Sequence, residues 1–291
     1  MPEAPPGAGP AIGIVGLGRL GSALRSVCRA GGTRVSLTAS RGAGWSVEAV
    51  PDVLVDASAP EAHGDVLDYC ATHRVPLVAC VSNLTDTQWK ALEGLAEVVP
   101  VVRATNLSFA HYLQVRIAEF TASLTTGRFG ATTTVRERHP PGKAHRPSAT
   151  ALALADTWAR ASGRPVADIA DERAGLPVSE HELTHTWDGE SLHVRHHVGS
   201  WTVPALGALA AADWAHAAPP GLATMRTVYD DLTARGFRLD QPGSATPGTA
   251  LPQPPAGGPP RRVVGPPEYA QYADDPPPCD APHRTPRPDP T

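Results

Sequence analysis

The stretch AIGIVGLGRLGSALRSVC, residues 11–28, decides the fold class. An apolar run ends in glycines, and the segment after it has a glycine stop, which predicts a strand followed by a helix. Gly16, Gly18 and Gly21 have GxGxxG spacing, with Arg19 and Leu20 between the last two. In such a turn the first glycine bends the chain, the second admits a pyrophosphate, and the third lets helix and strand pack closely. The stretch therefore predicts a dinucleotide-binding turn, in which all five residues contact the cofactor.

The same alternation of strand and helix continues to about residue 106. Strands are expected at residues 33–40, 52–58, 76–82 and 99–106, and helices at 61–74 and 86–98. A regular alternation of this kind predicts a parallel sheet with helices on both faces.

The pattern changes from about residue 130. Residues 131–138, 181–187 and 190–199 alternate between polar and apolar side chains, as half-buried antiparallel strands do. Helices are expected at residues 148–163, 207–218 and 222–236. The predicted fold class is α/β, a Rossmann-type domain with a smaller α+β domain for substrate binding and oligomerisation. We expect residues 11–108 and 205–238 in the first domain and residues 109–204 in the second.

Residues 239–291 hold half of the 32 prolines of the chain. Such a segment cannot bury enough apolar surface to offset its ordering entropy, so we expect a disordered tail. Its composition favours a solvated extension over a docking segment, although it permits both.

Composition excludes several classes of function. The net charge of -4 comes without any basic block, so neither nucleic acid nor a membrane surface is an expected partner. No apolar run is long enough for a membrane span, and the first residues lack the features of a signal peptide. The four cysteines have no CxxC spacing and are expected as reduced thiols, which indicates a cytoplasmic location.

The end of the second predicted strand bears on the choice of cofactor. An acidic residue there would bind the ribose hydroxyl of NAD, whereas this chain has Ser40 and Arg41. A hydroxyl and a guanidinium suit a 2′-phosphate, so NADPH is the expected cofactor and NADH stays possible. Arg41 could also be a solvated loop charge.

The stretch ERHPPGKAHRPSATA, residues 137–151, contains one of only two lysines in the chain, Lys143. Ser148 is a good N-cap for the helix that follows, and a helix N-terminus beside an ammonium attracts a carboxylate. His139 could supply a proton there. A capped helix after an ordinary loop would explain Ser148, but it leaves the lysine unexplained.

This stretch and five others resemble the motifs of the 4-hydroxy-tetrahydrodipicolinate reductase (dihydrodipicolinate reductase) family. The family signature E-x-H-H-x-x-K-x-D-A-P-S-G-T-A is matched at Glu137, His139, Lys143, Pro147, Ser148, Thr150 and Ala151. The other similar segments are the glycine turn, VDASAP with Asp56 and Pro60, ATNLS with Asn106 and Ser108, RAGLPVSEH with Arg173, Gly175 and His181, and GESLHVRHHVGSW with Glu190 and His196.

The resemblance implies a homotetrameric enzyme that passes hydride from NAD(P)H to a cyclic imine carrying two carboxylates. It implies that His139 donates a proton and that Lys143 is the companion acid facing a carboxylate. That carboxylate would be held at Ser148, Ala149 and Thr150. The further residues that the resemblance places at the cofactor are Ser58, Cys80, Val81, Ser82 and Asn106. Glu137 is expected only to orient its strand.

Departures from the family pattern cluster around the expected substrate. Pro140 replaces a histidine, His145 an aspartate, Ala149 a glycine and Trp201 an arginine, and residues 80–82 replace G-T-T. The pattern favours a reductase of another carboxylated nitrogen heterocycle, in specialised metabolism. The alternatives are a drifted enzyme of lysine and diaminopimelate biosynthesis, and a non-catalytic dinucleotide-binding protein, against which His139 and Lys143 argue.

His181 and His185 also belong to an HExxH sequence, the pattern of zinc proteases. That chemistry needs both histidines on one face of a helix. The alternating residues nearby predict a strand instead, on which the two histidines would lie about 13 Å apart. No metal is therefore expected.

Overall fold

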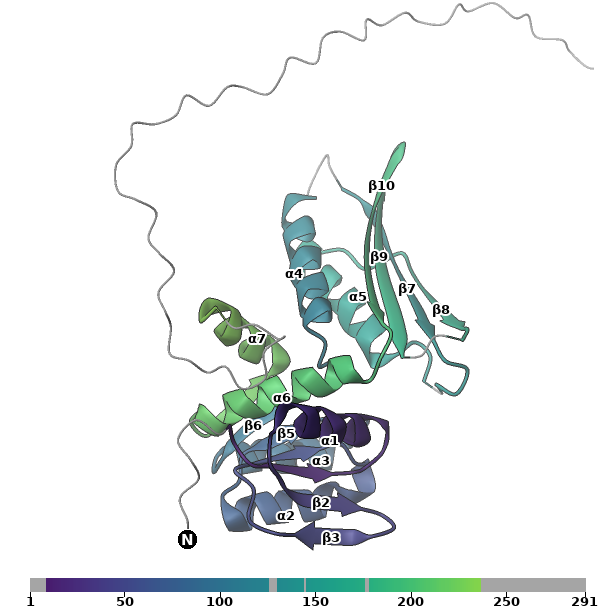
Figure 1. The fold of residues 1–291 in the computed structure, drawn as a ribbon. Helices are drawn as coiled ribbons and strands as arrows, with labels where there is room; N and C mark the ends of the chain where they lie inside the picture. The colour runs from purple at the N-terminus through teal and green to yellow at the C-terminus, as the bar shows by residue number, and fades with distance from the viewer. Residues whose placement is uncertain (1–8, 126–129, 144, 176–177, 237–291) are drawn as a thin grey trace, which may run out of the picture. The chain divides into compact units, whose positions relative to one another are not determined.

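A seven-stranded sheet with the order β11-β6-β5-β4-β1-β2-β3 forms the centre of the first domain (Figure 1). Its strands are β1 (Ile12–Val15), β2 (Val35–Ser40), β3 (Gly44–Val47), β4 (Val53–Asp56), β5 (Leu77–Ala79), β6 (Pro100–Arg103) and β11 (Gly221–Thr224). Every pair is parallel except β2 with β3, which closes one edge in the antiparallel direction. The parallel strands put their carboxyl ends, where cofactors bind in such sheets, along the same edge.

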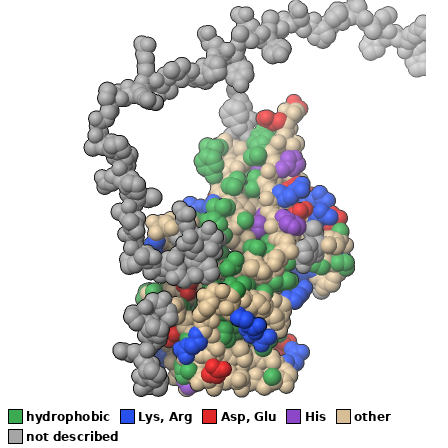
Figure 2. All heavy atoms as spheres, in the orientation of Figure 1, with side chains coloured by type: hydrophobic (Ala, Val, Ile, Leu, Met, Phe, Trp, Pro, Cys, Tyr) green, Lys and Arg blue, Asp and Glu red, His purple; other side chains and the backbone are tan. Residues whose placement is uncertain are grey.

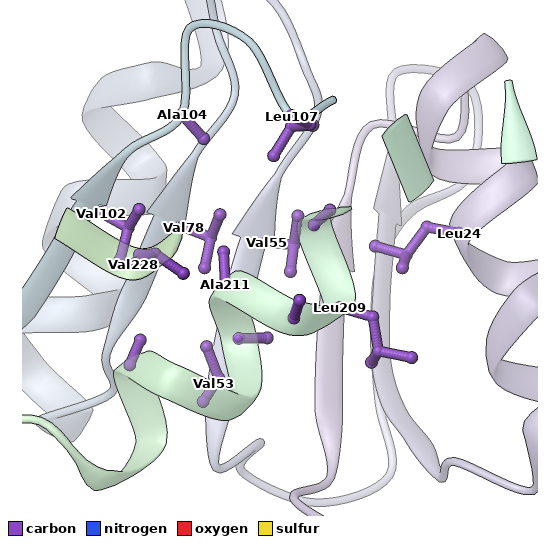
Figure 3. Packing of buried hydrophobic residues seen from close by; sticks show 14 of the residues in the cluster. Leu24, Val53, Val55, Val78, Val102, Ala104, Leu107, Leu209, Ala211 and Val228 are labelled. Carbon is purple, nitrogen blue, oxygen red and sulfur yellow. The ribbon is translucent and has the colours of Figure 1, made fainter. Parts of the chain in front are cut away.

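Helices cover both faces of this sheet, because alternate residues of its buried strands point to opposite sides. Val53 and Val55 of β4 pack with residues of α1 (Arg19–Gly31), α6 (Thr202–Ala217) and α7 (Met225–Ala234), as Figure 3 shows. Leu54, between them, packs with residues of α2 (His63–His73) and α3 (Asp86–Ala96). A short 3-10 helix, η1 (Pro60–Ala62), precedes α2.

The second sheet has four strands in the order β10-β9-β7-β8. They are β7 (Thr132–His139), β8 (Asp168–Arg173), β9 (Ser179–Trp187) and β10 (Glu190–Val198), and β8 runs parallel to β7 while the other pairs are antiparallel. Helices α4 (Phe109–Leu124) and α5 (Ala149–Ser162) pack on it through a small apolar cluster. Its buried members are Ala118, Val135, Ala151, Leu154 and Leu183.

The predicted fold class is confirmed, and so is the strand assignment of the HExxH sequence, which lies in β9. The sequence analysis missed α4, β3, β8 and β11. Strand β8, DIADER, lacks an apolar alternation, and β3 is short and exposed. The predicted domain boundary at residue 204 falls inside α6, which begins at Thr202, so the division into domains stays a prediction.

The computed structural model describes residues 9–125, 130–143, 145–175 and 178–236, all within a compact unit of residues 1–245. The predicted tail, residues 239–291, lies outside the described residues. No described helix is both long enough and apolar enough to cross a membrane.

Helix α6 makes an unusually close approach to the chain just before α4. The hydroxyl of Tyr229 donates a hydrogen bond to the carbonyl of Leu107 at 2.6 Å, and Gly207 lies against the same carbonyl. A side-chain carbon at residue 207 would collide with that oxygen and approach the Tyr229 hydroxyl to 2.9 Å. Glycine is therefore required where α6 passes the junction between the two sheets.

Replacing Gly207 with alanine should lower the free energy of unfolding by about 1–3 kcal/mol, because the new methyl group overpacks a buried site. Gly94 is the matched control, since it is also helical but has no atom within 4 Å of an added methyl group. Gly94→Ala should be neutral or stabilise by up to about 1 kcal/mol. Urea unfolding of the two variants measures this difference, and equal midpoints would contradict the close approach.

Candidate active site

The glycine turn between β1 and α1 fits the pyrophosphate of a dinucleotide. Gly16 has a φ of +89°, and a methyl group there would come within 2.5 Å of the Ala57 carbonyl oxygen. A methyl group on Gly21 would collide with the carbonyl of Gly16. Gly18 is different, because nothing lies within 4 Å of an added methyl group, and as the N-cap of α1 it offers no side chain to the first helical N–H groups. The first N–H groups of a helix lack helical partners, so without a side-chain cap they can bind an anion.

The turn after β4 forms a wall of this site. Asp56 is fully buried and its carboxylate accepts hydrogen bonds from the backbone N–H and the hydroxyl of Ser58, at 3.1 and 2.5 Å. The other oxygen lies 3.2 Å from Nδ1 of His63, which is also fully buried. The Ser58 hydroxyl thus bonds within the turn, and its predicted contact with the cofactor stays a prediction. His63 was missed because its helical neighbours give no sign of a buried carboxylate.

The other predicted cofactor residues lie at the ends of β2, β5 and β6. Ser40 is the last residue of β2, and the exposed guanidinium of Arg41 lies 3.9 Å from Glu61. Cys80 follows β5, and burial raises the pKa of its thiol, which therefore stays protonated. Val81 is buried and Ser82 exposed in the same loop.

Asn106 lies between the two parts of the candidate site. Its side-chain amide donates to the hydroxyl of Thr150 at 3.3 Å, and its oxygen accepts from the backbone N–H of Ser108 at 3.0 Å. The structure thus joins a predicted cofactor residue to a predicted substrate residue. The loop after β5 also contacts the loop that carries Lys143, because the side-chain amide of Asn83 lies 3.3 Å from Nε2 of His145.

Glu137 is the centre of the second part of the site. One carboxylate oxygen accepts hydrogen bonds from the backbone N–H of Ser148 at 3.0 Å and from the guanidinium of Arg173 at 3.3 Å. The other oxygen lies 3.4 Å from Nε2 of His139 and 3.6 Å from Nε2 of His181. The strand register explains this, because Glu137 pairs with His181 on β9, and His139 pairs with Arg173 on β8.

This environment keeps Glu137 ionised. Burial alone would raise the pKa of its carboxyl group, but the neighbouring rings of His139 and His181 and the hydrogen bond from Ser148 outweigh burial and lower the pKa well below its usual range. The sequence analysis gave Glu137 only an orienting role on its strand. The structure instead gives it contacts with four other residues, and the contact with His181 required a strand register that the sequence did not supply.

His139 has acceptors next to both ring nitrogens. Nδ1 lies 3.3 Å from the carbonyl of Val178, which can only accept, and Nε2 faces the carboxylate of Glu137. Burial lowers the pKa of His181 more than the Glu137 carboxylate raises it, and the neighbouring His139 and Lys143 lower it further.

Glu137, His139 and His181 are also the one group among the described residues whose ligand atoms could share a metal ion, lying within 4.8 Å of one another. The guanidinium of Arg173 already balances the carboxylate charge.

Two neighbouring histidines, His111 and His196, have their pKa values lowered to about 4, mainly by burial, and the Ser108 hydroxyl lies 2.9 Å from Nε2 of His196.

The predicted carboxylate site lies at the N-terminus of α5. Ser148 is the N-cap, as predicted, and its hydroxyl accepts from the N–H of Ala151 at 3.3 Å. Its own N–H is bound to Glu137, so Ser148 is engaged within the protein. Ala149 is exposed and Thr150 half-buried, and their N–H groups belong to the first turn, which lacks helical partners. Lys143 is exposed, and its ammonium has no hydrogen bond or ion pair within the described residues.

The class of protein follows from two features. One is a parallel sheet with a glycine turn that fits a dinucleotide, and the other is a second sheet with an exposed lysine five residues before the N-cap of a helix. The chain is an NAD(P)H-dependent oxidoreductase.

Comparison with known proteins identifies the family. The family model described as dihydrodipicolinate reductase, N-terminus, matches residues 11–107, and the one described as dihydrodipicolinate reductase, C-terminus, matches residues 111–229. The 4-hydroxy-tetrahydrodipicolinate reductase of Thiobacillus denitrificans is 33% identical over an alignment of 195 residues, which covers 60% of this chain and 72% of that protein. The enzyme of the same name from Halorhodospira halophila is 32% identical over an alignment of 260 residues, which covers 74% of this chain and 97% of that protein.

The fold is shared with a solved structure, dipicolinate-bound dihydrodipicolinate reductase from Paenisporosarcina sp. TG-14. The TM-score is 0.59 at 16% identity, over 74% of this chain and 97% of that one. The chain belongs to the dihydrodipicolinate reductase family.

Replacing Gly18 with valine should weaken dinucleotide binding while the chain stays folded. The new side chain meets no protein atom within 4 Å of its first carbon, and the φ of Gly18, -72°, is one that valine adopts. It would fill the space where a pyrophosphate approaches the backbone. NADPH fluorescence titration should show at least about a tenfold loss of affinity, while urea unfolding should show a loss of only about 1 kcal/mol, because valine is a poorer N-cap than glycine. Retained affinity would contradict the assignment of this turn.

Proposed function

We propose that the chain reduces 4-hydroxy-tetrahydrodipicolinate, a cyclic nitrogen heterocycle with two carboxylates, with NADPH as the hydride donor. The observation that carries this is the exposed Lys143, whose charge acts on His181, together with the start of α5, where the hydroxyl of the N-cap Ser148 lies 3.3 Å from the same histidine. The names of the relatives support this choice within the broader class of carboxylated heterocycles.

One substrate carboxylate would bind at the N-terminus of α5. The N–H groups of Ala149 and Thr150 and the hydroxyl of Thr150 are available donors, and the helix dipole favours an anion there. The ammonium of Lys143 adds a charge-assisted hydrogen bond. Ser148 supports the site from behind, through its cap on Ala151 and its bond to Glu137.

When bound, the nicotinamide supplies the hydride, and the protein has to supply one proton to the reduced bond. Both ring nitrogens of His139 face protein acceptors, whereas the ammonium of Lys143 is exposed. We therefore assign direct proton donation to Lys143, and to His139 a supporting role in the buried group around Glu137. This reverses the order of the two residues in the sequence-based hypothesis.

A second candidate substrate is a related heterocycle. Trp201 and His145, which replace an arginine and an aspartate of the family pattern, contact other residues of this chain. The ring of Trp201 lies 5.0 Å from the guanidinium carbon of Arg19, and the ring of His145 lies 3.3 Å from the amide of Asn83. A site with such changes could accept another carboxylated imine.

The oxidation of NADPH by freshly generated 4-hydroxy-tetrahydrodipicolinate tests the proposal. Rapid turnover supports it. NADPH binding without turnover would favour the second candidate, and related heterocycles would then be assayed. The absence of both binding and turnover would contradict the proposed function.

We also propose a homotetramer, which light scattering of the purified protein can test.

Replacing Lys143 with arginine should lower kcat by about 10²- to 10⁴-fold, because a guanidinium can bind a carboxylate but does not donate a proton. NADPH affinity should stay unchanged. Lys90→Arg is the matched control, since Lys90 is the other lysine of the chain and lies exposed on α3. Full turnover by the Lys143 variant would rule out proton donation by this residue.

Replacing Arg41 with alanine should raise KM for NADPH by about tenfold and leave KM for NADH nearly unchanged, because the guanidinium would bind only the 2′-phosphate. Arg25→Ala, an exposed position on α1, is the control. Parallel initial-rate measurements with the two cofactors give both constants. An equal effect on both would mean that Arg41 does not distinguish them.

A further inference from the structure

Arg173, at the end of β8, holds the backbone of the loop that carries Lys143. Its side chain is 4% exposed. Nε donates to the carbonyl oxygen of Lys143 at 3.0 Å, and a terminal nitrogen donates to the carbonyl oxygen of His145 at 2.6 Å. The remaining donors reach the carboxylate of Glu137 and the carbonyl of Glu172, at 3.3 Å each. A single buried guanidinium thus connects two loop carbonyls to the strand that carries Glu137.

The other end of the loop is held by Glu137. The oxygen that accepts from Arg173 also accepts from the N–H of Ser148, the N-cap of α5, at 3.0 Å. The Glu137–Arg173 pair therefore contacts the segment both at Lys143 and at the helix start. The distance between the lysine and the unpaired N–H groups of α5 depends on this pair.

The other contacts of the loop lie at the surface. The N–H of Lys143 donates to the carbonyl of Pro140 at 3.0 Å within the loop itself. Arg146 pairs with Asp171 at 3.1 Å with its side chain 52% exposed, and His145 contacts Asn83 in an exposed position. Exposed pairs of this kind contribute little to holding a fixed geometry. Of the described residues between Pro140 and Pro147, which are themselves half-buried, all are exposed: Pro141, Gly142, Lys143, His145 and Arg146.

We propose that Arg173 and Glu137 are positioning residues that set the place of Lys143 relative to the helix N-terminus. The proposal rests on the proposed function, in which Lys143 binds a carboxylate and donates the proton. Arginine is required because its planar fork presents five donors on three nitrogens at fixed angles, whereas the three donors of a lysine lie on a single nitrogen and cannot reach these four acceptors at once.

A double-mutant cycle between Arg173 and Lys143 tests the proposal. Arg173→Lys should lower kcat/KM by about 10²-fold, since a misplacement of about 1 Å has effects of this size. If Arg173 acts through Lys143, adding the same change to the Lys143→Arg variant should cost no more than about threefold. NADPH affinity should be unchanged in all variants. Losses that multiply in the double variant would overturn the proposal.

Hydrogen exchange gives a readout that does not depend on activity. In Arg173→Lys, the hydrogen-bonded amides of Lys143 and Ser148 should exchange faster by about tenfold or more, while those of α1 stay unchanged. Arg136→Lys is the matched control, because Arg136 lies on β7 and pairs with Glu172 at 2.8 Å in an exposed position. It should change neither exchange nor kcat/KM. Unchanged exchange in Arg173→Lys would overturn the proposal.

Should Arg173→Lys fail to fold, Glu137→Gln provides the same exchange test, because the amide can still accept from Ser148 but loses the charge that holds Arg173. Faster exchange at the hydrogen-bonded amide of Lys143 supports the proposal, and unchanged exchange there contradicts it. If the unaltered chain reduces none of the heterocycles, the proposed function fails, while hydrogen exchange still decides whether Arg173 positions the loop.

Discussion

The buried pair of Glu137 and Arg173 is the interaction on which the candidate substrate site depends. Burying two charges is unfavourable unless their remaining hydrogen-bonding groups are satisfied. Here one oxygen of the carboxylate accepts from Arg173 and Ser148, and the guanidinium also reaches two loop carbonyls. The pair therefore connects two strands, a loop and a helix start, and its desolvation cost is offset by the attraction between the charges and by these hydrogen bonds.

The cofactor site depends on a different constraint, which is the close approach of backbone to backbone. Gly16 and Gly21 leave no room for a side-chain carbon, while Gly18 faces open space. The carboxylate of Asp56 fixes the neighbouring turn through Ser58 and His63. A dinucleotide can thus be held mostly by backbone groups, which explains why the sequence signal for this part of the site is strong.

The sequence predicted the features that local chemistry determines. The glycine turn, the alternation of strands and helices and the N-cap at Ser148 each follow from neighbouring residues. The roles of Glu137, Arg173 and His181 could not be predicted in this way, because they arise from the register between β7, β8 and β9. Strand β8 has no apolar alternation that would place Arg173 on a strand at all.

The central claim is that one substrate carboxylate binds between Lys143 and the start of α5 while the dinucleotide occupies the glycine turn. A crystal structure of the protein with NADPH and dipicolinate tests it most directly. The account predicts a carboxylate oxygen at about 3 Å from the N–H of Thr150 and from the ammonium of Lys143, with the pyrophosphate against Gly18. A dipicolinate bound away from Lys143, with the cofactor in place, would contradict it.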